Sequence, residues 1–385
     1  MCLFLTPFDM TTELIILFVF LFFTVFQLFY FLYFFIRVPF FKDKEIDTNE
    51  TNIPISVIVC AFNEEANLRN NLTSWLEQDY LKNGLPYFEV LIVNDNSEDN
   101  TYYFLNEMKE KYPHLNVLHL TQTAKLIPGK KFALSMGIKS AKYEHLLLTD
   151  ADCIPASKKW ITKMAAHFTN DKKIVLGYGA YKKYDDTLNK KIRFETLHAA
   201  LQYLSYALAK VPYMGVGRNL AYTKELFNKN KGFSSHHHIV SGDDDLFINQ
   251  VANSKNVAVS INKGSFTYSE PKKNKSEWYF QKKRHLGTGK FYKTKHKILL
   301  GLYAFTQLFF FISFLTTLPF VGILIYTIPI FVLREFIMYF VYYKTCKKLN
   351  EDDLIRYILL FDFWLIFYHF KNFKTITIKT HQHWR

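Results

Sequence analysis

The sequence predicts an α/β domain with a mostly parallel sheet, flanked by transmembrane helices towards both ends of the chain. Three observations support this prediction. Short apolar runs alternate with amphipathic segments between residues 55 and 150, which is typical of a parallel sheet wound with helices. An uncharged run of 23 residues, Leu14–Ile36, precedes this region. Further long apolar segments follow it from residue 298 onwards.

The composition narrows the class of protein. The chain has 385 residues and a formal net charge of +14. Its Lys and Arg residues gather beside the apolar segments, as expected at an anionic membrane surface, and no basic motif with interleaved aromatic residues predicts nucleic-acid binding. The four cysteines show no C-x-x-C spacing, which argues against a disulfide framework or a zinc site and favours a reducing compartment. They are Cys2, Cys60, Cys153 and Cys346.

The first apolar segment is expected to span a membrane rather than to be a cleaved signal peptide. Leu14–Ile36 is long enough to cross a bilayer, no basic residue precedes it, and no small-residue cleavage site follows it. Acidic residues precede the segment and basic residues follow it: Asp9 and Glu13, then Arg37, Lys42 and Lys44. The positive-inside rule therefore predicts that the chain after Arg37 is cytoplasmic.

A polar linker over 43–53 leads into the strand–helix region. The expected strands cover 55–61, 88–93, 116–120 and the leucines 146–148, and the expected helices cover about 65–77, 99–111 and 129–140. No G-x-G-x-x-G follows the first strand, which argues against a dinucleotide-dependent oxidoreductase.

Beyond residue 173 the pattern is less regular. A strand over 173–179, a helix over 192–209, a glycine-punctuated loop and strand over 211–222, a helix over 246–252 and a strand over 257–261 are expected. A basic stretch from Trp278 to Lys297 then precedes the apolar segments.

The C-terminal region, 298–385, is expected to hold two or three membrane helices and a basic tail. Ile298–Leu318 and Pro319–Tyr343 predict a two-span hairpin, whose second half is interrupted by Arg334 and Glu335. Leu354–Phe370 is apolar but carries two charges, so an interfacial helix and a third span both remain open. The expected domains are therefore 1–40, 41–297 and 298–385.

Two carboxylates follow the buried run of leucines. Asp150 and Asp152 are two residues apart, so in a strand or tight turn both can face one point. They would lie beyond the carboxyl end of a parallel strand, where open α/β sheets bind ligands. Mg²⁺ binds one or two carboxylates together with substrate phosphates. The pattern therefore predicts a metal-assisted phosphate site, with an acidic turn before Pro155 as the alternative.

Other residues have chemistry that suits the same site. Asp95 ends the second strand and can accept a hydrogen bond from a base or ribose, or can cap the following helix. Lys130 and Lys131 lie at a helix start, which favours phosphate, although solvated lysines are the alternative. Gln281 and Arg284 lie one helical turn apart, and an arginine can bind a phosphate through two hydrogen bonds.

The triplet Asp243, Asp244 and Asp245 enters a predicted helix. Crowded carboxylates raise one another's pKa, which suits a general base, whereas a simple interaction with the helix dipole is the alternative. The preceding residues His236, His237 and His238 share no face of a regular element, so a solvated loop is favoured over a metal site. A contact with an acceptor remains open, because this loop precedes Asp244.

Together these motifs resemble the membrane-bound family 2 glycosyltransferases over about residues 54–290. The motifs are Ser56–Glu65, Val93–Ser97, Asp150-Ala-Asp152, Gly217-Arg-Asn219, Gly242-Asp-Asp244 and Gln281-x-x-Arg284. The resemblance implies a GT-A (Rossmann-like) catalytic domain that transfers a sugar from a nucleotide-diphosphate donor, with a UDP-sugar expected, and inverts the anomeric centre. The flanking apolar segments resemble those of the synthase-like branch, which includes cellulose, chitin and hyaluronan synthases.

The resemblance also implies roles for the matching residues. Asp244 would be the catalytic base and Asp152 would bind Mn²⁺ or Mg²⁺. The nucleotide sugar would contact Ala61, Glu64, Asp95, Lys130, Asp150, Gln281 and Arg284, and the acceptor side would include Arg218, Asn219, Asp243 and His285. His285 stands where the family motif has Trp. An imidazole stacks less area on a sugar, which argues against processive polymerisation.

The sequence thus predicts an integral membrane glycosyltransferase with a cytoplasmic catalytic domain, acting on a lipid-linked or glycan acceptor in cell-envelope glycan synthesis. The alternative is a processive polysaccharide synthase, although three or four spans make a channel hard to build. A nucleotidyltransferase would carry a Gly-rich loop after the first strand, which is absent here. A catalytically silent glycan-binding scaffold is disfavoured because the acidic series is intact.

Overall fold

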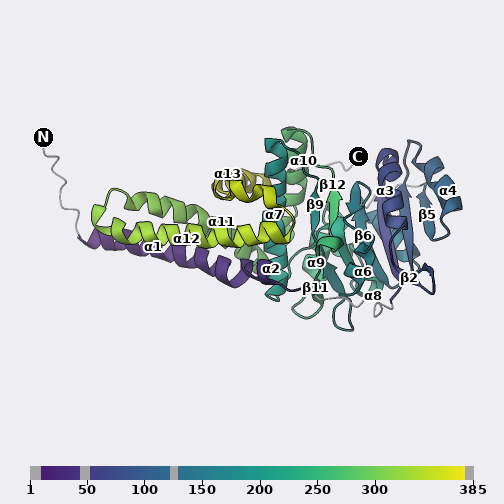
Figure 1. The fold of residues 1–385 in the computed structure, drawn as a ribbon, viewed down its shortest axis with the longest axis horizontal. Coiled ribbons are helices and arrows are strands. Elements are labelled where there is room, and N and C mark those ends of the chain that lie inside the picture. Colours follow the sequence, from purple (N-terminus) through teal and green to yellow (C-terminus); the bar gives the residue numbers. More distant parts are fainter. Residues whose placement is uncertain (1–9, 44–52, 122–128, 378–385) are drawn as a thin grey trace. The chain divides into compact units, whose positions relative to one another are not determined.

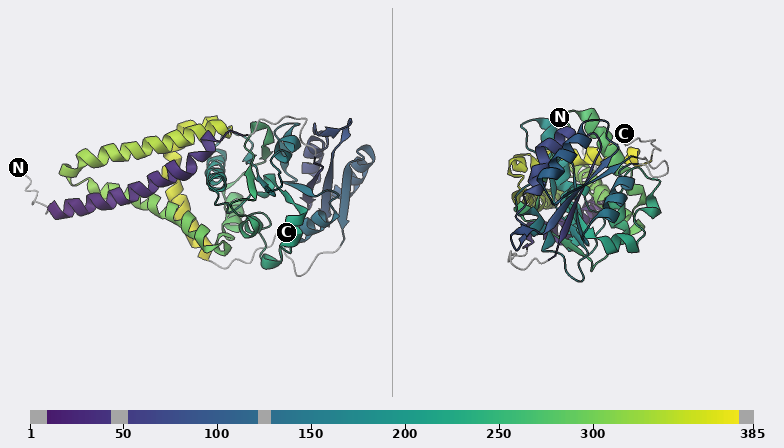
Figure 2. Two further views of the ribbon diagram at one scale, coloured as in Figure 1. Left: turned by 90° about the horizontal axis from the view of Figure 1, so that it is seen from below. Right: turned by 90° about the vertical axis from the view of Figure 1, so that its right-hand side faces the viewer.

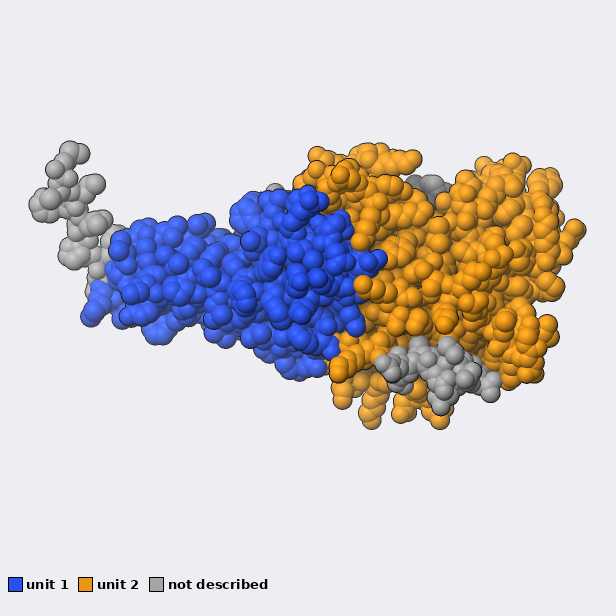
Figure 3. Space-filling view, in the orientation of Figure 1, with its two compact units in different colours: residues 1–40, 293–374 blue, residues 41–292, 375–385 orange. Residues whose placement is uncertain are grey.

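The computed structural model describes residues 10–43, 53–121 and 129–377, and it divides into two compact units (Figure 3). Unit 1 contains residues 1–40 and 293–374, and unit 2 contains residues 41–292 with 375–385. Most of the predicted linker, 44–52, and the end of the basic tail, 378–385, lie outside the described residues.

Unit 2 is built on a seven-stranded sheet with the order β11-β8-β10-β6-β1-β4-β5 (Figure 1). Its strands are β1 (Ile55–Ala61), β4 (Phe88–Asp95), β5 (Leu115–Leu120), β6 (His145–Asp150), β8 (Ile174–Leu176), β10 (Leu220–Thr223) and β11 (Val257–Val259). All neighbours pair in parallel except β10, which is antiparallel to both β6 and β8. The predicted mostly parallel sheet is confirmed.

The helices of unit 2 cover the sheet on both faces (Figure 2). They are α3 (Glu65–Leu76), α4 (Thr101–Lys111), α5 (Lys131–Ser140), α6 (Trp160–Ala165), α7 (Thr187–Leu208), α8 (Lys224–Lys229), α9 (Asp245–Val251) and α10 (Lys275–Leu286). On one face, α5 packs closely because Gly137 lacks a side chain: a Cβ there would lie 2.7 Å from Val93 Cγ2 and 3.1 Å from Ile58 Cγ2.

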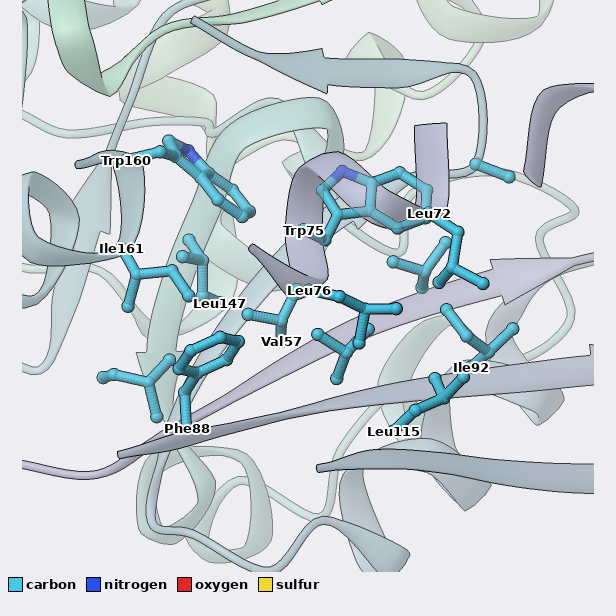
Figure 4. Packing of buried hydrophobic residues seen from close by; sticks show 14 of the residues in the cluster. Val57, Leu72, Trp75, Leu76, Phe88, Ile92, Leu115, Leu147, Trp160 and Ile161 are labelled. Atoms are coloured by element: carbon cyan, nitrogen blue, oxygen red, sulfur yellow. The ribbon is translucent and has the colours of Figure 1, made fainter. Parts of the chain in front are cut away.

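The main hydrophobic core lies on the opposite face of the sheet (Figure 4). Trp75 and Leu72 of α3 pack with Val57 of β1 and Ile92 of β4, and Trp160 of α6 joins the same cluster. Alternate residues of a strand point to opposite faces, so Val57 faces α3 while Ile58 faces α5. A strand buried on both faces explains why β1 reads as an unbroken apolar run.

The expected single strand over 173–179 is wrong in extent, because the segment forms two strands in two sheets. β8 belongs to the large sheet, whereas β9 (Gly179–Tyr181) belongs to a three-stranded sheet with the order β7-β12-β9. The other members, β7 (Cys153–Pro155) and β12 (Thr267–Ser269), were not expected from the sequence. Strands of three residues are too short to show a periodicity, and these pair with segments far along the chain.

The remaining short elements of unit 2 connect these layers. They are the hairpin β2 (Leu81–Lys82) and β3 (Leu85–Pro86), and the 3₁₀ turns η2 (Gly217–Asn219), η3 (Ser234–His236), η4 (Lys263–Ser265) and η5 (Gly289–Phe291).

Unit 1 is a helical bundle. It contains α1 (Met10–Phe29), the π-helical turn η1 (Tyr30–Phe35), α2 (Arg37–Phe40), α11 (Thr294–Thr317), α12 (Val321–Lys348), the 3₁₀ turn η6 (Asp352–Tyr357) and α13 (Ile358–Thr377). Among the described residues, three segments are long and apolar enough to cross a membrane: Met10–Phe40, Thr294–Thr317 and Val321–Lys348. The long helices α1, α11 and α12 run side by side, and α13 lies across them (Figures 1 and 2).

Arg334 and Glu335 interrupt the apolar run of the sequence but not the helix: α12 continues through both residues, as the predicted two-helix hairpin requires. The reason is a buried polar cluster inside unit 1. The guanidinium of Arg334, which has no exposed surface, donates to Asp362 Oδ2 at 3.0 Å and to Gln27 Oε1 at 2.7 Å. Gln307 Nε2 donates to Asp362 Oδ1 at 2.9 Å. The ion pair between Arg334 and Asp362 therefore compensates both buried charges. Together with Gln27 and Gln307, it joins α1, α11, α12 and α13.

Breaking this ion pair is expected to destabilise unit 1. Asp362→Ala would leave the buried Arg334 guanidinium with Glu335 as its remaining carboxylate partner, and loss of one partner of a buried ion pair costs about 3–5 kcal/mol in comparable cases. Thermal or denaturant unfolding of the full chain in detergent measures the effect, with the exposed Asp352→Ala as the matched control. Equal stability of the two variants would contradict this role of the pair.

Candidate active site

The candidate site lies at the carboxyl ends of three neighbouring parallel strands. Ala61, Asp95 and Asp150 are the last residues of β1, β4 and β6, and the strand register pairs Cys60 with Asp150 and Ala61 with Asn94. The strands thus end level with one another, as expected where an α/β sheet forms a ligand crevice. Ala61 and Asp95 are buried at this edge of the sheet, at 0% and 5% exposure.

The predicted carboxylate pair converges, as its spacing implied. Ligand atoms of Asp150, Asp152 and Cys153 all lie within 4.8 Å of one another. Burial and the charge of Asp150 raise the pKa of Asp152, so the two carboxylates repel each other in the absence of a cation. Burial raises the pKa of the Cys153 thiol well above its usual value, and its Sγ donates to Asp152 Oδ1 at 3.5 Å. The two carboxylates supply the oxygen ligands that a hard divalent cation prefers, whereas the protonated Cys153 thiol does not suit such an ion.

Two further predicted residues face this pair. Burial works to raise the pKa of Asp150, but the Lys130 ammonium outweighs it and holds that pKa below its usual value. The two side chains form an ion pair in the structure. Burial raises the pKa of Glu64, and the charges of Asp152 and Asp150 add to the effect. Glu64, at the start of α3, therefore lies on the same side as the pair.

The acidic triplet is held in place at the start of α9. Asp244 Oδ2 accepts from the backbone N–H of Gly217 at 2.7 Å, and Asp244 Oδ1 accepts from the N–H of Asp245 at 2.7 Å. Burial, followed by the charges of Asp243 and Asp245, nevertheless raises the pKa of Asp244 to about 8. A carboxylate with such a pKa is a competent proton acceptor near neutral pH.

Unlike Asp244, Asp245 is held by hydrogen bonds from side chains. It is buried, and its Oδ2 accepts hydrogen bonds from Thr288 Oγ1 and, at 2.7 Å, from Tyr292 Oη. These donors follow α10 in the chain. Asp245 therefore ties the segment after α10 to the triplet and is not available as a base. No sequence pattern indicated Thr288 and Tyr292.

The predicted acceptor-side residues Arg218 and Asn219 differ in their surroundings: Asn219 is buried inside the fold, whereas Arg218 adjoins the site. Asn219 has no exposed surface, and its amide group contacts Trp160 Nε1 and the carbonyls of Tyr178 and Ser265 at 2.7–3.1 Å. Its contact with an acceptor stays a prediction, and the structure gives it internal partners. Arg218 lies over the Tyr181 ring, 4.2 Å from its centroid, and donates to Ser269 Oγ at 2.9 Å. The charges of Asp152 and Asp150 act on Arg218, so its guanidinium adjoins the carboxylate pair.

The helix α10 carries Gln281 and Arg284, one turn apart as predicted. Among the described residues, the Gln281 Oε1 atom is buried without a hydrogen-bond partner. Lys282 forms an ion pair with Glu195 of α7, which anchors α10. His285 is close enough to Asp150 and Arg218 for their charges to act on it, so it faces the site.

The adjacent lysines and the adjacent histidines singled out in the sequence do not share one environment in the structure. Lys130 points to Asp150, whereas the Nζ of Lys131 donates to backbone carbonyls before the acidic triplet and faces no phosphate position. The expected solvated loop holds for His237 and His238, which are exposed, but is wrong for His236, which is buried because the loop folds back around Lys131. The only cluster with metal-ligand geometry among the described residues contains none of these histidines.

Comparisons with known proteins show which family this domain resembles. Residues 56–232 match the model of the family described as glycosyl transferase family 2. The chain is 27% identical over 207 residues to the probable glycosyltransferase YdaM of Bacillus subtilis (strain 168), covering 48% of this chain and 47% of that protein. It is 31% identical over 124 residues to the poly-beta-1,6-N-acetyl-D-glucosamine synthase of Staphylococcus epidermidis, covering 32% of this chain and 28% of that protein. The chain therefore spans less than half the length of these curated relatives.

A solved structure supports the fold independently. The mannosyltransferase PcManGT from Pyrobaculum calidifontis, in complex with GDP-Man and Mn²⁺, superposes with a TM-score of 0.53 at 16% identity. The alignment covers 91% of this chain and 99% of that one.

Proposed function

Because the chain carries a family 2 glycosyltransferase domain of the GT-A fold, we propose that it is an inverting glycosyltransferase with a nucleotide-diphosphate sugar as donor. The observation that supports this most directly is the meeting of two acidic clusters at one lysine. The charges of Asp150 and of Asp243 both act on Lys130. The carboxylate pair and the acidic triplet thus line one site, as a donor diphosphate and an acceptor hydroxyl require.

In the proposed mechanism, Asp244 takes the proton from an acceptor hydroxyl. The hydroxyl oxygen forms a bond to the anomeric carbon of the donor from the face opposite the diphosphate. The bond from that carbon to the diphosphate oxygen breaks, and the electron pair leaves with the diphosphate. Arg284 and Lys130 carry positive charge that stabilises the developing negative charge, and Gln281 orients the diphosphate by hydrogen bonding.

A divalent cation, Mn²⁺ or Mg²⁺, would fit Asp152 with Asp150 as its neighbour. When bound, such an ion neutralises charge on the leaving diphosphate. The repulsion between the two carboxylates supports this assignment, because a cation relieves it.

The acceptor is proposed to be lipid-linked or a glycan, and the catalytic domain is proposed to face the cytoplasm. The apolar segments of unit 1 support an integral membrane protein, and the basic residues after Leu14–Ile36 support the orientation. A UDP-sugar remains the favoured donor. A processive polysaccharide synthase is the alternative, since several relatives are named poly-beta-1,6-N-acetyl-D-glucosamine synthases. The smaller ring of His285 at the acceptor platform favours single addition.

The proposal is tested by release of nucleoside diphosphate from detergent-solubilised protein. A panel of UDP-, GDP- and dTDP-sugars with Mn²⁺ or Mg²⁺, and membrane extract as acceptor, should give metal-dependent release from one donor. Silence across the whole panel would favour a catalytically silent glycan-binding protein instead.

The rate should depend on pH through Asp244. A base works in its ionised form, so kcat/KM is expected to fall as the pH decreases through about 8, the raised pKa of Asp244. Asp243→Asn removes a negative charge that raises this pKa, and should therefore move the midpoint to lower pH. The exposed Asp171→Asn should leave the midpoint unchanged. Identical profiles for Asp243→Asn and the parent chain would contradict the assignment.

A further inference from the structure

Lys131, the second residue of the lysine pair, is completely buried. Its Nζ donates to the backbone carbonyls of His236, Ile239 and Ser241 at 2.8, 2.6 and 2.8 Å. An ammonium has three donors and no acceptor, so these three carbonyls satisfy it completely. The segment 236–241, called the histidine loop below, thus closes around one side chain from α5.

A second contact joins the same two segments. Gly129, just before α5, has a φ of +75° and packs against the histidine loop: a Cβ there would lie 2.4 Å from the carbonyl oxygen of Val240. The turn before α5 and the histidine loop therefore meet backbone to backbone. Lys131 lies directly beside this contact, so the loop is fixed at both Val240 and its three flanking carbonyls.

The histidine loop leads straight into the acidic triplet. Only Gly242, with a φ of +98°, separates Ser241 from Asp243. Burial lowers the pKa of Lys131 to about 8, while the charges of Asp243, Asp245 and Asp244 oppose that lowering. The ammonium therefore lies near the triplet and remains protonated at neutral pH. Its position affects both the path of the backbone and the field at the carboxylates.

We propose that Lys131 is a positioning residue that clamps the histidine loop and thereby sets the position of Asp244, while its neighbour Lys130 serves the donor site. The catalytic part of this inference rests on the proposed transferase activity. The clamp itself is a property of the fold. Loss of the ammonium leaves three carbonyls facing one point, which is a ready site for a small ammonium ion.

The test uses the full chain in detergent with Lys131→Ala, Lys131→Met and, as a matched control, Lys139→Ala at an exposed position of the same helix. Two readouts are taken with and without ethylammonium: hydrogen exchange of the segment 232–246, and turnover of the donor found by the panel. Lys131→Met keeps the bulk of the side chain without the charge, so it covers the case in which Lys131→Ala does not fold.

The clamp predicts faster exchange in the segment 232–246 in both Lys131 variants and not in Lys139→Ala. It predicts a loss of kcat of about 10²-fold, the size expected for a misplaced catalytic group, with nucleotide affinity unchanged. Ethylammonium should restore both readouts in Lys131→Ala and neither in Lys131→Met, where the methionine fills the space. Unchanged exchange in a folded Lys131 variant would overturn the proposal. Faster exchange in a chain with no turnover of any donor would instead count against the transferase activity alone.

Discussion

Asp244→Asn is expected to abolish turnover while leaving nucleotide binding intact. The substitution keeps the shape of the side chain and an acceptor oxygen for the Gly217 N–H, but removes the group that takes the proton. General-base catalysis contributes about 10²–10⁴-fold, so a loss in that range is expected in kcat. Release of nucleoside diphosphate measures kcat, and titration with the nucleotide measures binding.

Asp171→Asn, at an exposed position outside the site, is the control for this prediction and should retain the activity of the parent chain. Turnover of Asp244→Asn within a few fold of the parent would remove Asp244 from the role of base. Asp243 would then become the next candidate in the triplet.

Asp152→Ala is expected to abolish the metal dependence of donor binding. A metal ion supplies several kcal/mol of stabilisation to a charged leaving group, so turnover should fall by about 10²-fold or more. Nucleoside diphosphate affinity, measured with and without Mn²⁺, should depend on the ion in the parent chain and not in the variant. Equal affinities with and without metal in the parent chain would contradict a metal site at Asp152.

The unfolding temperature of Asp152→Ala shows whether its loss of turnover comes from the missing metal ligand or from misfolding. The pKa of Asp152 is raised by burial and by Asp150, so its ionised form opposes folding at neutral pH. Without added metal, Asp152→Ala should therefore unfold at the same temperature as the parent chain or at a higher one. A lower unfolding temperature would show that the carboxylate has a structural role.

The parallel strands could be predicted because each carries its own signal. β1 and β6 are apolar runs buried on both faces, and their observed limits lie close to the predicted ones. The convergence of Asp150, at the end of β6, and Asp152, just after it, followed from the alternation of side chains along a strand. The same reasoning could not find β7, β9 and β12, because their partners are distant and each strand has only three residues.

Adjacent residues of the same type show a second limit of sequence patterns. Lys130 and Lys131 looked equivalent at the start of a helix. On a helix, however, neighbouring residues point about 100° apart, so one reaches Asp150 and the other reaches the histidine loop. Only the position of the loop relative to α5 gives the second lysine its partners.

By itself, the sequence determined the α/β class, the apolar segments, the order of the strands along the chain and the acidic residues at the sheet edge. These features depend on local periodicity and on residue chemistry, and both can be read from short stretches of the sequence. The tertiary structure decided the antiparallel position of β10, the internal role of Asn219, the Arg334–Asp362 pair and the Lys131 clamp. Each of these requires two segments far apart in the chain to meet. Buried polar groups must find such partners, and only the folded chain determines which ones they find.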